Sequence, residues 1–222
     1  MKYQRVKRAL DVFISLIAII LLLPLFLIIS ILIKIDSKGS VIFKQERSGL
    51  HKKVFTLYKF RSMKTETPKY CATRKLNKID CYVTNVGHFL RKTSLDELPQ
   101  LFNILKGDMS FIGPRPVVIT ETDLIETRDK YGVNDILPGI TGYAQINGRD
   151  ELEVEEKTMF DSFYKNNISF TLDLSIFLKT FLVVLKREGI KAKDTKRTQK
   201  REIVLLKTKT DNYINDDKTM VK

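Results

Sequence analysis

The chain has 222 residues, and 39 Lys and Arg residues against 26 Asp and Glu residues give it a formal net charge of +13. This length is enough for one compact domain plus a membrane element. Because only one apolar run reaches spanning length, a transporter with several membrane helices is excluded. The two cysteines, Cys71 and Cys81, lie in a polar stretch without a CxxC motif. A disulfide framework or a zinc site is therefore not expected, and reduced thiols on a cytosolic face fit better.

Positive charge is concentrated in the N-terminal part of the chain. Residues 1–92 carry 19 basic and 5 acidic side chains, whereas residues 121–161 carry 11 acidic and 4 basic ones. A basic half suits an anionic partner, which could be nucleic acid, a phosphate-bearing substrate or a lipid surface. A solvated, lysine-rich surface would give the same pattern, so charge alone does not choose among these readings.

An uncharged run of 22 residues extends from Val12 to Ile33. As a helix it would measure about 33 Å, which matches the roughly 30 Å hydrocarbon core of a bilayer. The run is longer than the apolar core of a secretory signal peptide, and no small-x-small cleavage site follows it. It is therefore expected to be retained as a membrane element.

Both flanks of this run are basic, and a proline interrupts it. Positive charge marks the cytoplasmic side of a membrane segment, so two basic flanks favour both ends on the same side. Pro24 lacks a backbone N–H and is expected to kink the helix into arms of about 18 Å and about 14 Å. Residues 1–36 are therefore predicted to form a re-entrant membrane helix. A kinked helix that crosses the membrane once and a buried helix of a soluble protein remain alternatives. The flanking basic residues are Lys2, Arg5, Lys7, Arg8, Lys34, Lys38, Lys44 and Arg47.

Residues 37–190 are predicted to form a cytosolic domain. Alternating apolar and polar residues in 41–46 and 54–62 predict a β-hairpin, with Gly49 expected to take a positive φ in its turn. The polar residues 64–82 are expected to form a surface loop.

A helix is predicted over residues 97–105, because its apolar residues recur at spacings of three and four. Gly107 is expected to end it. Pro99 would lose a needed N–H if the helix began at Ser94, so Asp96 is the preferred N-cap. The apolar residues are Leu98, Leu101, Phe102 and Leu105.

Two glycine- and proline-rich segments are predicted to be rigid loops. "GPRP" (113–116) should form an extended turn that fixes the direction of Arg115. "LPGITGYAQINGRDE" (137–151) should form a second loop. Further helices are predicted over 150–165, burying Met159, Phe160 and Phe163, and over 172–188, either in the core or at a membrane interface.

The lysine-rich residues 191–222 are expected to be a disordered tail. The predicted fold class is therefore α+β. A re-entrant membrane helix is joined to a small, mostly helical domain with a β-hairpin and interfacial helices.

Asp96 and Glu97 form an acidic pair with Arg91 on one side and Arg115 on the other. Neighbouring residues of a helical turn project about 100° apart, so one carboxylate could bind a metal while the other faces a reacting atom. Carboxylates, Mg²⁺ and arginine clamps are the parts that phosphoryl transfer needs. The alternative is that the two carboxylates only cap a helix and complement its dipole.

Several motifs resemble the bacterial sugar transferase family. They are, in chain order, "KRALDV", "LLP", "IKIDSKGSVIFKQERSG", "FTLYKFRSM", "LRKTSLDELPQLFNILKGDMSFIGPRP" and "LPGITGYAQINGRD". The resemblance as a whole extends from about residue 5 to residue 188. Specifically, the chain is similar to small monotopic phosphoglycosyl transferases, which start glycan assembly on a polyprenyl phosphate carrier.

The resemblance implies a mechanism with a covalent intermediate. A UDP-sugar would bind with Mg²⁺, and Asp96 would attack its sugar-bearing phosphorus and expel UMP. A polyprenyl (undecaprenyl) phosphate would then attack the aspartyl-phosphosugar and give polyprenyl-diphosphate-sugar, in ping-pong fashion. This step would initiate capsule, exopolysaccharide or glycoconjugate synthesis, and downstream glycosyltransferases are candidate partners.

The resemblance also implies roles for single residues. Glu97 would be the Mg²⁺ ligand, and Arg115 would orient the polyprenyl phosphate or the diphosphate. Lys59 and Arg91 would hold phosphate oxygens. Gln145 and Arg149 would lie in a loop near the nucleotide-sugar. For Lys59 and Arg149 a surface salt bridge is an equally good explanation.

The family's apolar helix is re-entrant and broken at a proline, which implies a place on the cytoplasmic face of the bacterial inner membrane. Many members carry Ser-Pro at the break, whereas this chain has Leu23 and Pro24. Ser15 and Ser30 lie too far along the helix to bond the freed carbonyl of Ile20.

A membrane-tethered binding protein for anionic lipid or nucleic acid is the competing function. Such a protein would bind by charge alone and has no need of an acidic pair between two arginines. The enzyme is therefore preferred, and nucleic acid is not expected as a partner.

Overall fold

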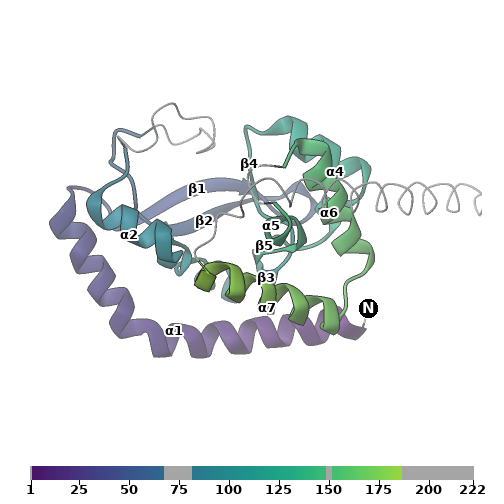
Figure 1. Ribbon diagram of the computed structural model, residues 1–222, viewed down its shortest axis with the longest axis horizontal. Helices are drawn as coiled ribbons and strands as arrows, with labels where there is room; N and C mark the ends of the chain where they lie inside the picture. Colours follow the sequence, from purple (N-terminus) through teal and green to yellow (C-terminus); the bar gives the residue numbers. More distant parts are fainter. Residues whose placement is uncertain (1, 68–81, 149–151, 187–222) are drawn as a thin grey trace, which may run out of the picture.

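The computed structural model describes residues 2–67, 82–148 and 152–186. Within these ranges the chain is a mixture of helices and short strands arranged above one long N-terminal helix (Figure 1). Four expectations fall outside the described residues: most of the loop 64–82, the two cysteines, Arg149 and the C-terminal tail.

Helix α1, Lys2–Asp36, is a continuous helix that contains Pro24. Its ribbon runs along the underside of the molecule and then bends upward (Figure 1). A proline removes one helical hydrogen bond and crowds the preceding turn, which accounts for a bend inside a helix. Ser15 and Ser30 donate to the carbonyls of Val12 and Phe26. As expected, neither serine bonds to the carbonyl of Ile20.

Both ends of α1 are bonded to the rest of the protein. Near the N-terminus, Lys7 forms an ion pair of 2.7 Å with Asp173. Near the C-terminus, Asp36 accepts a hydrogen bond of 3.0 Å from the backbone N–H of Val86. Arg61 donates to the last carbonyls of this region, those of Ser37 and Lys38. The helix is thus held at its two ends while its middle is left largely uncovered.

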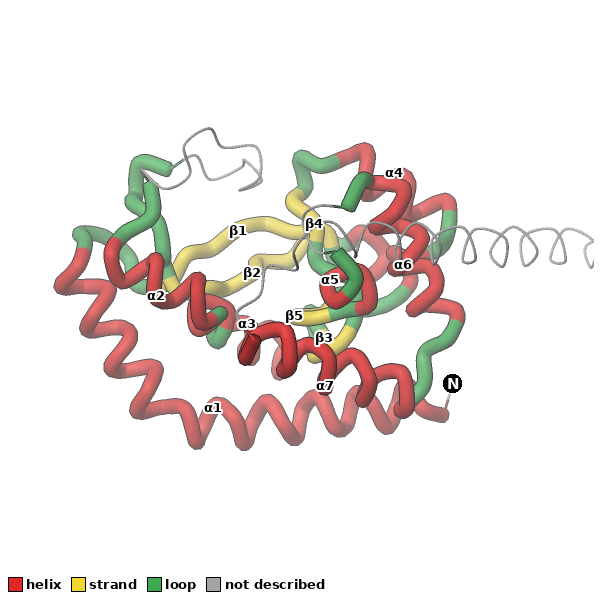
Figure 2. Tube along the Cα trace, viewed as in Figure 1, coloured by secondary structure: helices red, strands yellow, loops and turns green. Residues whose placement is uncertain are grey.

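The β-hairpin predicted from residues 41–46 and 54–62 is confirmed. Strands β1, Ile42–Ser48, and β2, Val54–Phe60, pair antiparallel, and β4, Val117–Val118, adds to the other edge of β1. A second, parallel pair consists of β3, Ser110–Ile112, and β5, Gly139–Thr141. The yellow segments of Figure 2 show both small sheets above α1.

The predicted turn conformation of Gly49 is wrong. Its φ is −116°, and the positive φ angles of the turn belong to His51 and Lys52. The turn contains a short 3₁₀ helix, η1, Leu50–Lys52, so it is longer than a two-residue turn. Gly49 is instead buried with its Cα close to the Phe55 ring, where a Cβ would lie 2.9 Å from the ring.

The helix predicted over residues 97–105 is divided into two pieces. A 3₁₀ turn, η4, Leu95–Glu97, precedes α3, Gln100–Lys106, and Pro99 is the N-cap of α3. Asp96 therefore does not cap the helix, because the chain changes from 3₁₀ to α geometry around the proline. Gly107 ends α3 with a φ of 97°, as predicted. Helix α2, Asn85–Thr93, lies just before η4 and was not predicted.

The C-terminal half follows the predictions in part. Helix α6, Val154–Asn166, begins at a capping box of Glu153 and Glu156 and buries Met159 and Phe160, while Phe163 is only partly covered. The segment 137–151 is not a plain loop, since it contains β5 and α5. The remaining elements are α4, Thr122–Lys130, η5, Val133–Asp135, α5, Tyr143–Ile146, and α7, Phe170–Lys186.

Helix α7 lies beside the N-terminal arm of α1 (Figure 1). Ile176 on one of its faces is fully buried against Tyr164, while Phe177 and Phe181 are more than half exposed. The exposed apolar surface of α1 is larger, and Leu21 is 72% exposed. Only 17% of the most apolar 18-residue window of α1 is buried, which is unlike the core helix of a soluble protein. This helix is long and apolar enough to cross a membrane.

Candidate active site

The acidic pair lies in the tight turn η4, between α2 and α3. Ser94, just before it, has a left-handed conformation with a φ of 58°. Leu95 and Leu98 flank the pair and pack against the cluster formed by Ile29, Ile33, Phe60 and Leu90. The backbone of the turn is therefore anchored by apolar contacts with the C-terminal arm of α1, which places the two carboxylates beside this helix.

Helix α3 is fixed to strand β2 through one buried side chain. The carboxamide of Asn103 accepts a hydrogen bond of 3.0 Å from the N–H of Tyr58 and donates one of 2.7 Å to the carbonyl of Thr56. Asn103 is fully buried. These two bonds set β2 against α3, and so they bring Lys59 from β2 toward Glu97.

Glu97 accepts two charged hydrogen bonds on the same oxygen. Lys59 Nζ lies 2.7 Å and Arg115 Nη2 lies 2.9 Å from Glu97 Oε1. Burial on its own would raise the pKa of the Glu97 carboxyl, but the charges of Arg115 and Lys59 outweigh burial and hold that pKa well below its usual range. Glu97 is therefore a stable anion in this site.

Asp96 has the opposite electrostatic situation. Burial raises the pKa of its carboxyl, and the negative charge of Glu97 adds to that effect. Lys59, Arg91 and Arg115 lower the pKa, but they do not fully compensate. The carboxylate of Asp96 is thus less stabilised than that of its neighbour. The five residues expected at the centre of the site therefore lie close together: Lys59, Arg91, Asp96, Glu97 and Arg115.

Arg115 is held by the backbone of its own loop. The N–H of Gly113 donates to the carbonyl of Thr141 over 2.9 Å, and the N–H of Gly139 donates to the carbonyl of Pro114 over 2.9 Å. A Cβ on Gly139 would lie 2.1 Å from the nitrogen of Gly113, so this approach of two backbones requires glycine. The "GPRP" segment has no regular structure apart from these bonds, as predicted.

A buried ion pair supports the same loop from the other side. Arg128 Nη1 donates to the carbonyl of Arg115 over 2.8 Å, and Arg128 Nη2 lies 2.6 Å from Asp161 Oδ2. Both side chains are almost fully buried. Neither residue was predicted from the sequence, because nothing in their local sequence distinguishes them from other charged helix residues.

Gln145 lies on α5, and its amide donates to the carbonyl of Ile140 over 2.9 Å. Its Oε1 atom is buried without a hydrogen-bond partner among the described residues. The expected role of Gln145 near a nucleotide-sugar stays a prediction. Lys59 does form a salt bridge, but with Glu97 inside the site rather than on the surface.

The carboxylates suit a Mg²⁺ ion that a substrate helps to bind. No group of three or more His, Cys, Asp or Glu side chains that could hold a metal occurs in the described ranges of the chain. Mg²⁺ is commonly held by one or two carboxylates together with substrate phosphates and water. The hydrogen bonds from Lys59 and Arg115 reach Oε1 of Glu97, and a carboxylate engaged in this way can still coordinate a cation through Oε2. The donor set therefore fits the ion only in the presence of a phosphate ligand.

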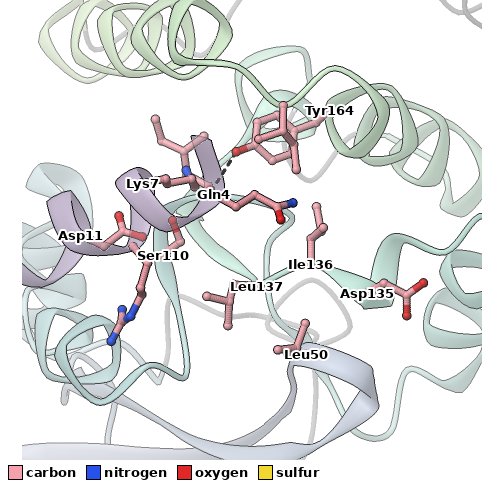
Figure 3. Close-up of a pocket in the computed structure, with 12 residues that line it drawn as sticks. Gln4, Lys7, Asp11, Leu50, Ser110, Asp135, Ile136, Leu137 and Tyr164 are labelled. Atoms are coloured by element: carbon pink, nitrogen blue, oxygen red, sulfur yellow. Dashed lines mark hydrogen bonds between the residues drawn. The ribbon is translucent and has the colours of Figure 1, made fainter. Parts of the chain in front are cut away.

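A cavity of about 210 Å³ lies apart from the acidic pair, near the N-terminal end of α1. Figure 3 shows Lys7 and Asp11 of α1 on one side of it and Ile136 and Leu137 on the other. Lys7 is bonded to Asp173, and Asp11 accepts from the N–H of Phe111. Because Lys7 and Asp11 are engaged in these bonds within the protein, their role beside this cavity is structural.

Comparison with known proteins identifies the class of this protein. The family model for bacterial sugar transferases matches residues 2–187. The chain belongs to this family, and the resemblance found in its motifs is confirmed. The expectation of an enzyme is confirmed with it.

Three relatives illustrate the range of the family. The chain is 46% identical over 166 residues to the uncharacterized sugar transferase EpsL of Bacillus subtilis, covering 75% of this chain and 79% of EpsL. It is 39% identical over 198 residues to the exopolysaccharide production protein ExoY of Rhizobium meliloti, covering 82% of this chain and 87% of ExoY. It is 38% identical over 198 residues to the undecaprenyl-phosphate galactose phosphotransferase of Salmonella typhimurium. That match covers 82% of this chain but only 41% of the Salmonella protein.

Proposed function

We propose that the protein transfers a phosphosugar from a UDP-sugar to a polyprenyl phosphate and releases UMP. The relatives support the acceptor, since the names of three of them specify undecaprenyl-phosphate phosphotransferases for galactose, glucose or N-acetylgalactosamine. The observation that carries the proposal is the pair of adjacent carboxylates with opposite pKa shifts, surrounded by Lys59, Arg91 and Arg115.

Asp96 acts as the nucleophile in this proposal. A carboxylate oxygen of Asp96 attacks the sugar-bearing phosphorus, a P–O bond to UMP breaks, and an aspartyl-phosphosugar forms. An oxygen of the polyprenyl phosphate then attacks the same phosphorus, restores the Asp96 carboxylate and gives polyprenyl-diphosphate-sugar. The raised pKa of Asp96 supports this assignment, because a poorly stabilised carboxylate is a better nucleophile than one held in ion pairs.

The remaining charged groups bind and neutralise phosphate. Lys59 and Arg115 hold Glu97 in place and present positive charge at the position of the transferred group. Glu97, together with substrate phosphates, would hold Mg²⁺, which would supply further charge neutralisation when bound. Arg91 contributes to the same positive field.

The membrane placement in this proposal is a re-entrant helix. Because Lys7 and Asp36, near the two ends of α1, both bond to one domain, a domain on one side of the membrane keeps both ends on that side. The bend in α1 and the exposed apolar surface between its ends support an apolar wedge in the cytoplasmic leaflet of the bacterial inner membrane. Leu95 and Leu98 connect this wedge to the acidic turn, where a lipid phosphate would arrive.

Release of UMP from a panel of UDP-sugars, measured with undecaprenyl phosphate in detergent or nanodiscs, tests the proposed reaction. We expect one or a few UDP-sugars to give Mg²⁺-dependent UMP release and Asp96→Asn to abolish it. The control variant Asp123→Asn removes an exposed carboxylate in the first turn of α4 and should retain turnover. Wild-type turnover by Asp96→Asn would show that the nucleophile is wrongly assigned. Mass spectrometry of the intact protein with donor alone should detect the phosphosugar adduct.

A further inference from the structure

A second, smaller cavity is lined in part by Lys59 and Arg115, the two residues that bond to Glu97. It offers about 10 Å³ to the centre of a water-sized atom, which is room for a single oxygen. Strands β1 and β2, the start of α3 and the "GPRP" loop surround it. Its lining residues are Arg47, Leu57, Lys59, Gln100, Arg115 and Pro116.

Two hydrogen-bond donors on the wall of this cavity lack a partner. Gln100 is 1% exposed, and its Nε2 atom has no hydrogen-bond acceptor within the part of the chain that the structure describes. The same holds for Arg47 Nε, which is also buried. Buried donors in folded proteins are almost always paired. Two such donors on one cavity indicate a site for an acceptor atom.

The direction of the Arg47 side chain is fixed by its other nitrogens. Arg47 Nη1 donates to the carbonyl of Pro116 over 3.0 Å, and Nη2 donates to the side-chain oxygen of Gln45. With the guanidinium plane held at two points, Nε cannot turn away to find another partner. Gln100 is the first residue of α3, and the bonds of Asn103 hold that helix in position.

The charge of the cavity favours an anion. Three cationic side chains line it, and among the described residues no carboxylate does. Glu97 is bonded to two of these cations, Lys59 and Arg115, and leaves Arg47 as the third. Burial, together with the nearby charge of Arg115, lowers the pKa of Arg47 to about 10, and a bound anion would relieve this effect. An anionic oxygen fits the size of the cavity, accepts hydrogen bonds from both unpaired donors and complements the positive charge of the lining.

We propose that this cavity binds one phosphate oxygen of a substrate, with Gln100 Nε2 and Arg47 Nε as its donors. The inference rests on the proposed phosphosugar transfer and adds two residues to its phosphate-binding set. The oxygen can come from the diphosphate of the nucleotide-sugar or from the phosphate of the lipid acceptor, since both offer the same chemistry.

The test uses the full chain in detergent or nanodiscs with Gln100→Met, which keeps the size of the side chain but removes the donor. UDP binding is measured by calorimetry, and the KM for undecaprenyl phosphate is measured separately. A loss of one charged hydrogen bond corresponds to about a tenfold weaker affinity. A tenfold weaker UDP affinity assigns the cavity to the donor diphosphate, and a tenfold higher acceptor KM assigns it to the lipid phosphate. The matched control Gln4→Met, at an exposed position of α1, should change neither value.

A second variant, Arg47→Lys, keeps the positive charge but lacks Nε, and it carries the test if Gln100→Met does not fold. Thermal unfolding establishes that each variant is folded. If folded variants keep the wild-type UDP affinity and acceptor KM, the cavity holds only water and the inference is wrong. UDP binding needs no turnover, so weaker UDP binding in a protein that transfers no sugar would refute the proposed reaction and leave this site standing.

Discussion

Asp96 and Glu97 are neighbours in the chain, yet their surroundings shift their pKa values in opposite directions. The difference arises from geometry, because both Lys59 and Arg115 donate to Glu97, while Asp96 is only near these charges. Two carboxylates with separated pKa values can take separate roles, one as a fixed anion and one as a reacting group.

The pH dependence of kcat/KM should be bell-shaped. Asp96 reacts as a carboxylate, so activity falls as the pH drops through its pKa, which lies above the usual value of about 3.9. Burial also lowers the pKa of Lys59, so the alkaline limb should lie below the usual lysine value of about 10.4. In Lys59→Arg the alkaline limb should move upward, because a guanidinium keeps its charge. An acid limb at the ordinary aspartate value would contradict the raised pKa of Asp96.

Removing the charge of Asp96 and removing that of Glu97 should change the free energy of unfolding in opposite directions. The pKa of Asp96 is raised in the folded state, so its ionised form costs stability at neutral pH. Asp96→Asn should therefore raise the melting temperature, and this gain should vanish as the pH falls through the folded pKa. Glu97 has a lowered pKa, so it stabilises the fold above about pH 4.5 and loses this contribution at lower pH.

Glu97→Gln should lower the free energy of unfolding by about 3 kcal/mol at neutral pH, because it leaves Lys59 without its anion. Thermal and chemical unfolding in detergent at several pH values measure both variants. Shifts of the same sign in Asp96→Asn and Glu97→Gln would contradict the electrostatic difference between the two carboxyls.

Arg128 should act as a positioning residue for Arg115. In Arg128→Lys the ammonium can still pair with Asp161 but cannot also reach the carbonyl of Arg115 in the same geometry. We expect the KM for the UDP-sugar to rise about tenfold, with kcat changing much less, since a small displacement of a phosphate clamp is costly. Steady-state kinetics provide the values.

Asp161→Asn is the matched variant for this prediction, since it removes the ion pair but keeps the bond from Arg128 to the Arg115 carbonyl. It should lower stability with a smaller effect on KM. If Arg128→Lys lowers only the melting temperature and leaves KM unchanged, the residue is structural and does not position Arg115.

The two ends of α1 should be on the same side of the membrane. Single cysteines at Arg5 and at Lys38, both exposed positions, would be placed in a background with Cys71→Ser and Cys81→Ser. A membrane-impermeant maleimide should label neither position in intact cells and both positions in inverted membrane vesicles. Labelling of Arg5→Cys in intact cells would instead show a helix that crosses the membrane once.

The sequence allowed prediction of those features that depend on local patterns. Alternation revealed the hairpin, the apolar run revealed α1, and the spacing of Leu98 and Leu101 indicated the helix after the acidic pair. The start of that helix was misplaced, because whether Pro99 begins α3 or follows a 3₁₀ turn depends on packing against α1, which no local pattern contains.

Long-range contacts account for the other differences. Strands β3, β4 and β5 are two or three residues long, and they exist because distant backbones pair. The site residues Asp96, Glu97 and Arg115 could be proposed from motifs. Arg128 and Gln100 could not, because the signal in each case is a buried contact or an unpaired donor that only the folded chain makes visible.

The attachment of α1 at both ends has a consequence for how the protein responds to lipid packing. In the proposed re-entrant placement, no charged terminus has to pass through hydrocarbon, so insertion avoids the large cost of burying Lys and Arg in the bilayer. The wedge displaces acyl chains from one leaflet only. Its affinity should therefore grow with packing defects and curvature in that leaflet, which would concentrate the protein where the lipids on its own side are most loosely packed.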